Sequence, residues 1–426
     1  MARAGVFTHH DHQRNLVLNS FHEIFWGFGI AFHSTEAVIP LFLKELGAPL
    51  IVIGSVAGVF TICAAVLQIF SAFYGGRVRN IKAAVIAVNG LLVPPIFLAG
   101  FIFAFISPTG SSAWLFYYIN YVLFALSLGI VFPIWADFLG TVHLREKRGT
   151  FFGVSFAFNS AAGIFGGLAV KKLLSSSVPF PANFGYGFLI YTGCIIAATI
   201  LFLFYRTQPR PVHSRDRTFG QFLTKVRSIL ARNKNFRRYI ISRMLLTANY
   251  PAISLYAVYS QSKLNFDISE AGIFAAITVL LAALSSYATG KMGDRFGHKN
   301  AMVLIFTAYL LALVSALTAT TMAQTYLIFI FLGLGKGGFL TSAMSLVYEF
   351  AGQEDKKIYF ALIDSLTAPF VLLFIVLVGL LIPIFGIPIV LVGIGLIVVL
   401  GILSLMLLTK EPGAVRSELP PPETVL

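Results

Sequence analysis

Charged residues are scarce in this sequence, and their scarcity excludes a soluble fold. Asp, Glu, Lys and Arg make up 11% of the 426 residues, whereas soluble domains carry about 25%. Hydrophobic residues make up 58%, and the mean hydropathy is +0.85. A water-soluble core cannot bury that much apolar surface, so the sequence predicts a protein whose solvent is the lipid bilayer.

Cysteine is almost absent as well. The two cysteines, Cys63 and Cys194, lie inside apolar segments, where cysteine behaves as a small hydrophobic residue. We therefore predict neither a disulfide nor a cysteine metal site. His33 and Glu36 are one helical turn apart and could share a metal ion, but no second ligand cluster stands out, so no metal site is predicted.

The motifs of common enzymes are missing too. The sequence contains no zinc-protease helix, no serine elbow and no sizeable soluble domain. The glycine-rich segment around Lys336 is not a nucleotide-binding loop, because the lysine is not followed by Ser or Thr. We expect a protein that is not an enzyme and that holds no cofactor.

Twelve apolar segments are long enough to cross a bilayer, which takes about 20 residues. The sequence thus predicts an all-α integral membrane protein with two pseudo-symmetric six-helix bundles. Its predicted parts are an N-terminal tail (1–18), a first bundle (19–206), a basic amphipathic linker on the inner membrane surface (207–237), a second bundle (238–409) and a C-terminal tail (410–426). The predicted spans are 19–42, 50–73, 82–106, 113–136, 150–171, 185–206, 238–261, 268–290, 299–321, 324–349, 358–382 and 386–409.

The positive charge is placed on one side of these spans. The formal net charge is +14, and most Lys and Arg lie in the two tails and in every second gap. The alternate gaps hold only Lys44, Lys171, Lys172 and Lys263. Positive charge collects on the cytoplasmic side, so we expect both termini in the cytoplasm, a plasma (inner) membrane location and contact with anionic lipid. This placement argues against nucleic-acid binding.

The two halves share a local pattern. Asp137-Phe138 follows the fourth span and Glu349-Phe350 ends the tenth, and a basic cluster and an aromatic helix start come after each. A weak internal repeat of this kind is typical of transporter folds.

A short charged segment between the eighth and ninth spans carries the most specific motif. Its pattern resembles the signature loop of the major facilitator superfamily. The resemblance implies a secondary transporter in which helices 1, 4, 7 and 10 line a central cavity that opens to one side and then the other. The residues that carry it are Gly290, Gly293, Asp294, Arg295, Gly297 and Lys299.

The resemblance also implies a gate. The glycines of the loop would form a tight turn, Asp294 would meet the N-terminus of helix 5 near Thr150, and Arg295 would pair with Glu349. Asp137 is the counterpart of Glu349 in the first half. Such contacts would form only while the cytoplasmic side is closed.

Ionisable residues inside a span are costly and invite a functional interpretation. At about 100° per residue, His22, His33 and Glu36 fall on one face of helix 1. A carboxyl group beside a histidine in a low dielectric can carry a proton, so these residues are the predicted proton-coupling site. Alternatively, His22 and Glu23 sit in water at the cytoplasmic mouth.

Lys336, in the middle of helix 10, is predicted either to bind an anionic substrate or to provide a counter-charge for Glu36. Polar side chains on neighbouring helices are further substrate candidates: Asn120, Asn249 and Tyr256. Arg243 and Asp364 lie at matching depths in helices 7 and 11, and they are predicted to form a structural ion pair.

We therefore hypothesise a monomeric carrier of a small polar solute, anionic if Lys336 contacts it, driven by protons or by sodium ions. One alternative is drug or metabolite efflux by proton antiport, because Ala162 to Gly167 is similar to the antiporter signature of the superfamily without its proline. A second is a membrane receptor that transports nothing.

Overall fold

The computed structural model describes residues 7–75, 78, 80–144, 147–208, 227–352 and 356–412, and no strand occurs among them. The predicted all-α fold is confirmed. Most of the predicted linker and C-terminal tail lies outside the described residues. The elements are α1 (His9–Ile30), η1 (Ala31–His33), α2 (Val38–Glu45), α3 (Leu50–Gly75), α4 (Ile81–Gly90), α5 (Val93–Phe101), η2 (Ile102–Ile106), α6 (Ser111–Leu139), α7 (Arg148–Leu174), α8 (Ala182–Leu201), η4 (Phe202–Phe204), α10 (Lys234–Leu246), α11 (Asn249–Leu264), α12 (Glu270–Phe296), α13 (His298–Thr318), α14 (Met322–Ala351) and α15 (Lys356–Leu408).

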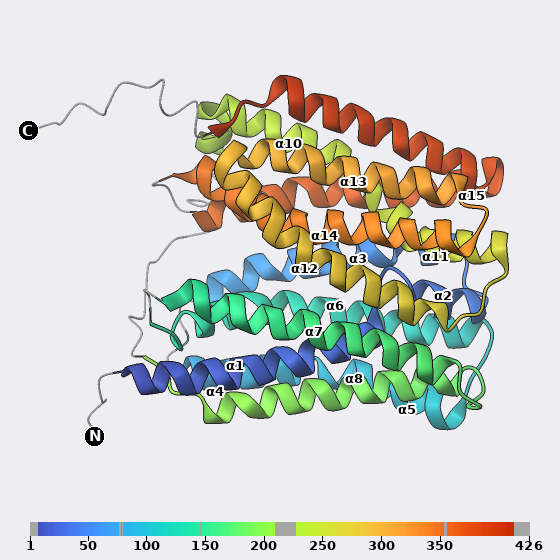
Figure 1. Ribbon diagram of the computed structural model, residues 1–426, viewed down its shortest axis with the longest axis horizontal. Coiled ribbons are helices and arrows are strands. Elements are labelled where there is room, and N and C mark those ends of the chain that lie inside the picture. Colours follow the sequence, from blue (N-terminus) through green and yellow to red (C-terminus); the bar gives the residue numbers. More distant parts are fainter. Residues whose placement is uncertain are drawn as a thin grey trace, which may run out of the picture.

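The helices form two bundles that lie side by side (Figure 1). In the first bundle α1 packs against α7 and α8, and α3 packs against α6. In the second, α12 and α13 pack against α14, and α10 packs against α15. The first helix begins and α15 ends at the same end of the molecule, on the left in Figure 1. We call this the terminal end and the opposite one the far end.

Among the described residues, ten helical stretches are long and apolar enough to cross a membrane. Helix α15 has 53 residues, which would measure about 80 Å if straight, far more than a hydrocarbon core of about 30 Å. Its backbone reverses at Gly386, with φ 77° and ψ 162°, where the sequence predicted a boundary. Together with α10 and α11, the two halves of α15 make the structure consistent with twelve crossings.

The first helix begins at His9, earlier than the predicted start at residue 19. Thr8 and Asp11 form a capping box, and the side chain of Asn15 is buried. The Asn15 amide donates to the carbonyl oxygens of Val142 (2.8 Å) and Arg206 (2.7 Å). A hydropathy criterion misses this start, because polar side chains that bind loop backbones replace the apolar residues it looks for.

The described contacts between the bundles gather toward the far end. A Cβ atom on Gly272 of α12 would lie 2.3 Å from the carbonyl oxygen of Gly167 of α7, so glycine is what allows the two backbones to approach. Nearby, Lys171 Nζ lies 2.9 Å from Glu270 Oε1, and Tyr326 donates to the other oxygen of Glu270 at 2.8 Å. The ribbons of α7 and α12 diverge toward the terminal end (Figure 1).

Candidate functional site

The first membrane-crossing segment is interrupted in its middle. After η1, Ser34 is extended, with φ −69° and ψ 129°, and α2 starts at Val38. Ser34 organises the break, since its hydroxyl accepts from the Val38 N–H (3.2 Å) and its carbonyl from the Ile39 N–H (3.0 Å). Irregular backbone at membrane depth is tolerated only where protein or a water-filled cavity surrounds it. Glu36 lies in this break and is 6% exposed.

Glu36 forms an ion pair with Lys336 of α14 through its Oε1 atom. This contact joins the first bundle to the second. The Glu36 side chain is 8% exposed, whereas the Lys336 side chain is 55% exposed, so solvent reaches the ammonium group far more than the carboxylate. This direct contact supports the alternative in which Lys336 is a counter-charge for Glu36.

The glycines around Lys336 bring backbones together. A Cβ atom on Gly337 would lie 1.8 Å from the carbonyl oxygen of Ala282 in α12, and one on Gly335 would meet the Tyr309 ring of α13 at 2.8 Å. Close packing of α14 on these two helices leaves Lys336 to reach the first bundle. These glycines therefore serve close helix packing.

His33 and Glu36 do not share a face as predicted, because the helix ends between them. The His33 ring lies among aromatic rings of the first bundle, with centroid distances of 5.0 Å to Phe124, 5.5 Å to Tyr191 and 5.7 Å to Tyr121. It is 1% exposed, and neither ring nitrogen has a hydrogen-bond partner within the described part of the chain. A continuous helix was assumed in the prediction, and the break at Ser34 turns the two side chains to different neighbours.

His22 lies in a separate buried cluster with Glu23. The His22 Nδ1 atom is 3.3 Å from Glu23 Oε1, and the Asn159 amide of α7 donates to Glu23 Oε2 at 2.8 Å. His22 and Glu23 are 4% and 3% exposed, so the alternative that placed both in water is wrong. All three residues belong to the first bundle.

The second bundle also contains an interrupted helix, the seventh crossing. Helix α10 ends at Leu246 and α11 begins at Asn249. Pro251 has no backbone N–H to donate and lies in the first turn of α11, where a helix tolerates proline. The first and seventh crossings, which hold equivalent places in the two halves, are thus both broken near their middle.

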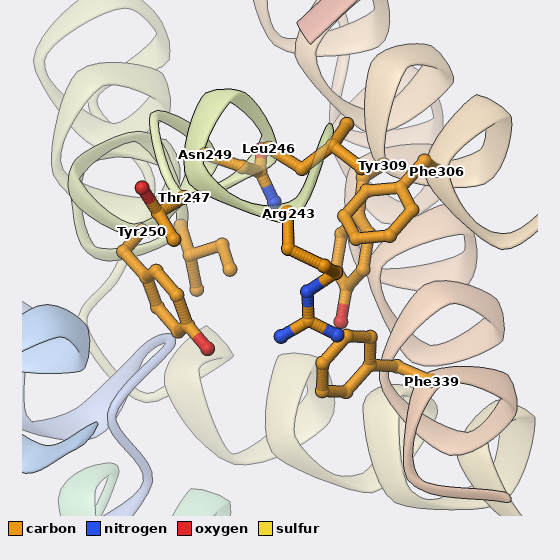
Figure 2. Close-up of a pocket in the computed structure, with 9 residues that line it drawn as sticks. Arg243, Leu246, Thr247, Asn249, Tyr250, Phe306, Tyr309 and Phe339 are labelled. Carbon is orange, nitrogen blue, oxygen red and sulfur yellow. The ribbon is translucent and has the colours of Figure 1, made fainter. Parts of the chain in front are cut away.

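A small cavity of about 40 Å³ lies beside the break in the seventh crossing. Arg243, which is 7% exposed, extends into it, and its guanidinium carbon lies 4.4 Å from the Phe339 ring centroid. Figure 2 shows the guanidinium directed between the rings of Tyr250 and Phe339, with the Tyr309 hydroxyl beside it. The other residues around the cavity are Leu246, Thr247, Asn249, Ile253 and Phe306.

The predicted ion pair of Arg243 with Asp364 remains a prediction. The two charges interact electrostatically, but among the described residues no carboxylate oxygen is recorded within 4.0 Å of the Arg243 guanidinium. Tyr250, Tyr309 and Phe339 come from three separate helices, so no sequence pattern links them to Arg243. Pro251 was the one sequence signal for this cavity, because it marks the helix break beside which the cavity lies.

The other substrate candidates are held within their own helices. Asn249 lines the cavity, and its Oδ1 atom accepts from the Tyr256 hydroxyl at 3.5 Å. Tyr256 itself is fully buried. Asn120 donates to the Phe116 carbonyl oxygen one turn earlier in α6, at 2.9 Å. Of these three residues, the structure brings only Asn249 to the cavity.

The turn at the signature loop is shorter in the structure than predicted. Gly290, Gly293, Asp294 and Arg295 belong to the last turns of α12, and the turn is Gly297 alone, with φ 91°. Gly293 instead makes room for the His298 ring, which a Cβ atom would meet at 2.1 Å. Long helices that reach beyond the apolar span explain the difference.

The predicted gate contacts are not recorded among the described residues. The Asp294 side chain is 82% exposed and lies 3.5 Å from His298 Nε2, away from the start of α7. The Arg295 guanidinium lies 5.1 Å from the ring of its neighbour Phe296. Lys299 instead binds the end of α15, since its Nζ atom donates to the Thr409 carbonyl oxygen at 3.0 Å.

Asp137 and Glu349, the remaining gate candidates, occupy equivalent places. Each is half-buried in the last turn of its helix, Asp137 in α6 and Glu349 in α14. This correspondence agrees with the repeat seen in the sequence. The basic clusters that follow them lie partly outside the described residues.

Comparison with known proteins identifies the family. The model of the Major Facilitator Superfamily matches residues 24–259 and again 238–424. The fold is similar to that of a POT family transporter in complex with 5-aminolevulinic acid (TM-score 0.72, 12% identity, 94% of this chain and 96% of that chain). It is also similar to the nucleoside transporter NupG in its D323A form (TM-score 0.70, 14% identity, 94% and 100%).

A third similar structure is the bacterial homologue of the human lysosomal transporter Spinster, inward-facing and unoccupied (TM-score 0.68, 11% identity, 97% and 100%). No curated protein matches the chain. Identities this low show the fold alone, but the family model spans nearly the whole chain in two repeats. The chain therefore belongs to the major facilitator superfamily of membrane transporters, the family that the segment from Gly290 to Lys299 predicted.

Proposed function

We propose that this protein is a secondary active transporter that moves a small polar, anionic organic solute by alternating access, coupled to protons. The observation that carries the proposal is the Glu36–Lys336 ion pair, which joins the two bundles at the break in the first helix. A rocking transporter must break such a contact whenever its bundles move apart. A contact that forms in one state only is what lets a ligand or a proton shift the population of states.

Protonation of Glu36 is the proposed coupling step. A neutral carboxyl group no longer attracts the Lys336 ammonium, so the tie between the first crossing and α14 weakens. The described contacts between the bundles gather toward the far end, which supports a state closed on that side. If the termini are cytoplasmic, as the distribution of Lys and Arg indicates, this is the inward-facing state.

His33 supports the coupling step only indirectly in this proposal. It is enclosed by aromatic rings and has no described contact with Glu36, so a proton would reach Glu36 through the space around Lys336. His22 lies inside the first bundle beside Glu23 and would take part in coupling only through that bundle. Glu36 is therefore the proposed site of proton exchange, and neither His22 nor His33 exchanges the transported proton directly.

Uptake into proteoliposomes tests this assignment. Wild-type protein and the Glu36→Gln variant would be supplied with an imposed pH gradient, or with a sodium gradient at constant pH. The solutes would be those that similar structures suggest: a nucleoside, a peptide and 5-aminolevulinic acid. Glu36→Gln should fold normally and lose pH-driven uptake, by roughly tenfold or more, because Gln cannot release a proton.

Glu45→Gln is the matched control, since Glu45 is exposed at the end of α2 in the same crossing. It should transport as the wild type does. If uptake driven by a pH gradient persists in Glu36→Gln, the coupling role of Glu36 is refuted. Reversing the gradient distinguishes symport from the efflux by antiport that the glycines of α7 suggested, and absence of transport in every arm would favour a receptor.

A further inference from the structure

The Arg243 cavity is a second charged site between the helices, and it differs from the Glu36–Lys336 ion pair in one respect. Lys336 already has a carboxylate partner. Arg243 has an aromatic ring on one side and no described carboxylate within 4.0 Å. We infer that Arg243, with Tyr250 and Tyr309, forms a subsite for the carboxylate group of the transported solute. The inference rests on the proposed transport function. It places the anionic group of the solute at Arg243, whereas the sequence suggested Lys336.

The chemistry of arginine supports this assignment. A guanidinium stays protonated at all relevant pH values and presents a planar fork of donors that matches a carboxylate. A buried cation without a close counter-ion is costly. Stacking on Phe339 compensates part of that cost, and Asp364 contributes from a longer distance. An incoming carboxylate would supply the close counter-charge that no described carboxylate provides.

The shape of the cavity limits what enters it. Its volume of about 40 Å³ has room for a few water molecules or one carboxylate group, not for a whole organic solute. The Tyr250, Ile253 and Phe339 side chains that line it are partly exposed. The remainder of the solute would therefore extend out of the cavity past these three residues.

Tyr309 connects the cavity to the Glu36–Lys336 ion pair. Its hydroxyl interacts electrostatically with both Glu36 and Arg243, and its ring lies against Gly335, next to Lys336. Tyr309 therefore lies between the proposed carboxylate subsite and the Glu36–Lys336 ion pair. Solute binding and the proposed proton site would then be adjacent, as coupled transport requires.

Binding of a matched pair of probes tests the subsite without a transport assay. Benzoate and benzamide are planar and similar in size, and only benzoate carries a charge at neutral pH. Ligand binding would be followed by the thermal unfolding shift of the purified protein in detergent, and by calorimetry. Benzoate should stabilise the wild type and benzamide should not.

The Arg243→Gln variant should bind benzoate roughly 10- to 100-fold more weakly, which is the range for loss of charged hydrogen bonds. If that variant does not fold, Arg243→Lys keeps the charge but loses the planar fork, and it should still bind several-fold more weakly. Arg237→Gln is the matched control, because Arg237 is exposed on the same helix. It should bind as the wild type does.

Equal benzoate affinity in the wild type and the Arg243 variants would overturn the inference, as would absence of benzoate binding to the wild type at millimolar concentrations. Transport results separate this inference from the proposed function. Benzoate binding that requires Arg243 in a protein that transports no solute would keep the subsite and refute the transporter. Proton-coupled uptake of an anionic solute that is unchanged in Arg243→Lys would keep the transporter and refute the subsite.

Discussion

Glu23 and Glu36 are two buried carboxylates of the same membrane-crossing segment, and their partners differ. Glu23 is 3% exposed and Glu36 is 6% exposed. Glu23 accepts a hydrogen bond from Asn159 within its own bundle. Glu36 pairs with Lys336 of the opposite bundle. The two groups have the same chemistry and similar burial, yet one contact lies inside a single bundle and the other lies between the two bundles.

Burial alone therefore does not distinguish a charge that stabilises the fold from one that acts in transport. In the proposed transport cycle, a contact inside one bundle persists while the bundles move, so it stabilises every state equally. A contact between bundles stabilises only the states in which it forms. We therefore expect changes at Glu23 to alter stability and changes at Glu36 to alter transport.

The largest expected effect is on transport, from Lys336→Glu. This change places a second carboxylate opposite Glu36, and two like charges at about 4 Å repel by about 4 kcal/mol at an effective dielectric constant of 20. Uptake into proteoliposomes should fall at least tenfold. Exchanging the two residues, with Glu36→Lys and Lys336→Glu together, should recover part of the uptake. An exchanged protein that is no better than Lys336→Glu alone would show that the attraction between the two residues is not what matters.

A smaller effect is expected on stability, from Glu23→Leu. The half-buried Asn159 amide would lose its side-chain acceptor, which costs about 1–3 kcal/mol of the free energy of unfolding. Glu36→Leu should cost less than about 1 kcal/mol, because the Lys336 side chain is 55% exposed and water can solvate its ammonium group. Denaturant unfolding in detergent measures both values. Glu23→Gln, which keeps an acceptor oxygen, should be close to the wild type, and the reverse order of stabilities would contradict the comparison.

The smallest effect is expected at Asp267, an exposed carboxylate in the loop before α12. Hydrogen bonds from the Ser269 hydroxyl and backbone N–H hold the pKa of Asp267 below its usual value. A depressed pKa in the folded state means that the stabilisation is present above the unfolded pKa and is lost as the pH falls through the folded pKa. Asp267→Asn should remove this acid-dependent loss, at less than about 1 kcal/mol for so exposed a group.

Thermal unfolding between neutral and acidic pH checks this prediction, with uptake measured in parallel. Uptake by Asp267→Asn should match that of the wild type. An unchanged acid dependence of unfolding in the variant would show that Asp267 does not contribute. The effects of Asp267→Asn on unfolding and uptake thus serve as the reference for the effects of changes at Glu23 and Glu36.

Much of the architecture could be predicted from the sequence, since it follows from local rules. Most of the predicted span boundaries in the fourth to sixth crossings lie within one helical turn of the observed helices, and the reversal at Gly386 was placed correctly. The start at His9 was missed, because Asn15 makes contacts with residues far away in the chain. The turn at Gly297 was predicted too long, because a helix that leaves the membrane does not have to end there.

The site was predictable only in part. Lys336 was associated with Glu36 as one of two alternatives, from the cost of charge inside the membrane, and the structure places the two in contact. His33 was grouped with Glu36 because a continuous helix was assumed. The Arg243 cavity was not predicted, since its walls come from α10, α11, α13 and α14.

The bilayer as solvent, the all-α fold and the family could be predicted from the sequence, because apolar length, turn chemistry and the segment from Gly290 to Lys299 are local properties of the chain. Tertiary structure alone decided which charges meet. Glu36 and Lys336 are 300 residues apart in sequence, and only packing of the two bundles brings them together. Helix breaks at Ser34 and before Asn249 then set where each side chain points, which no helical periodicity can show.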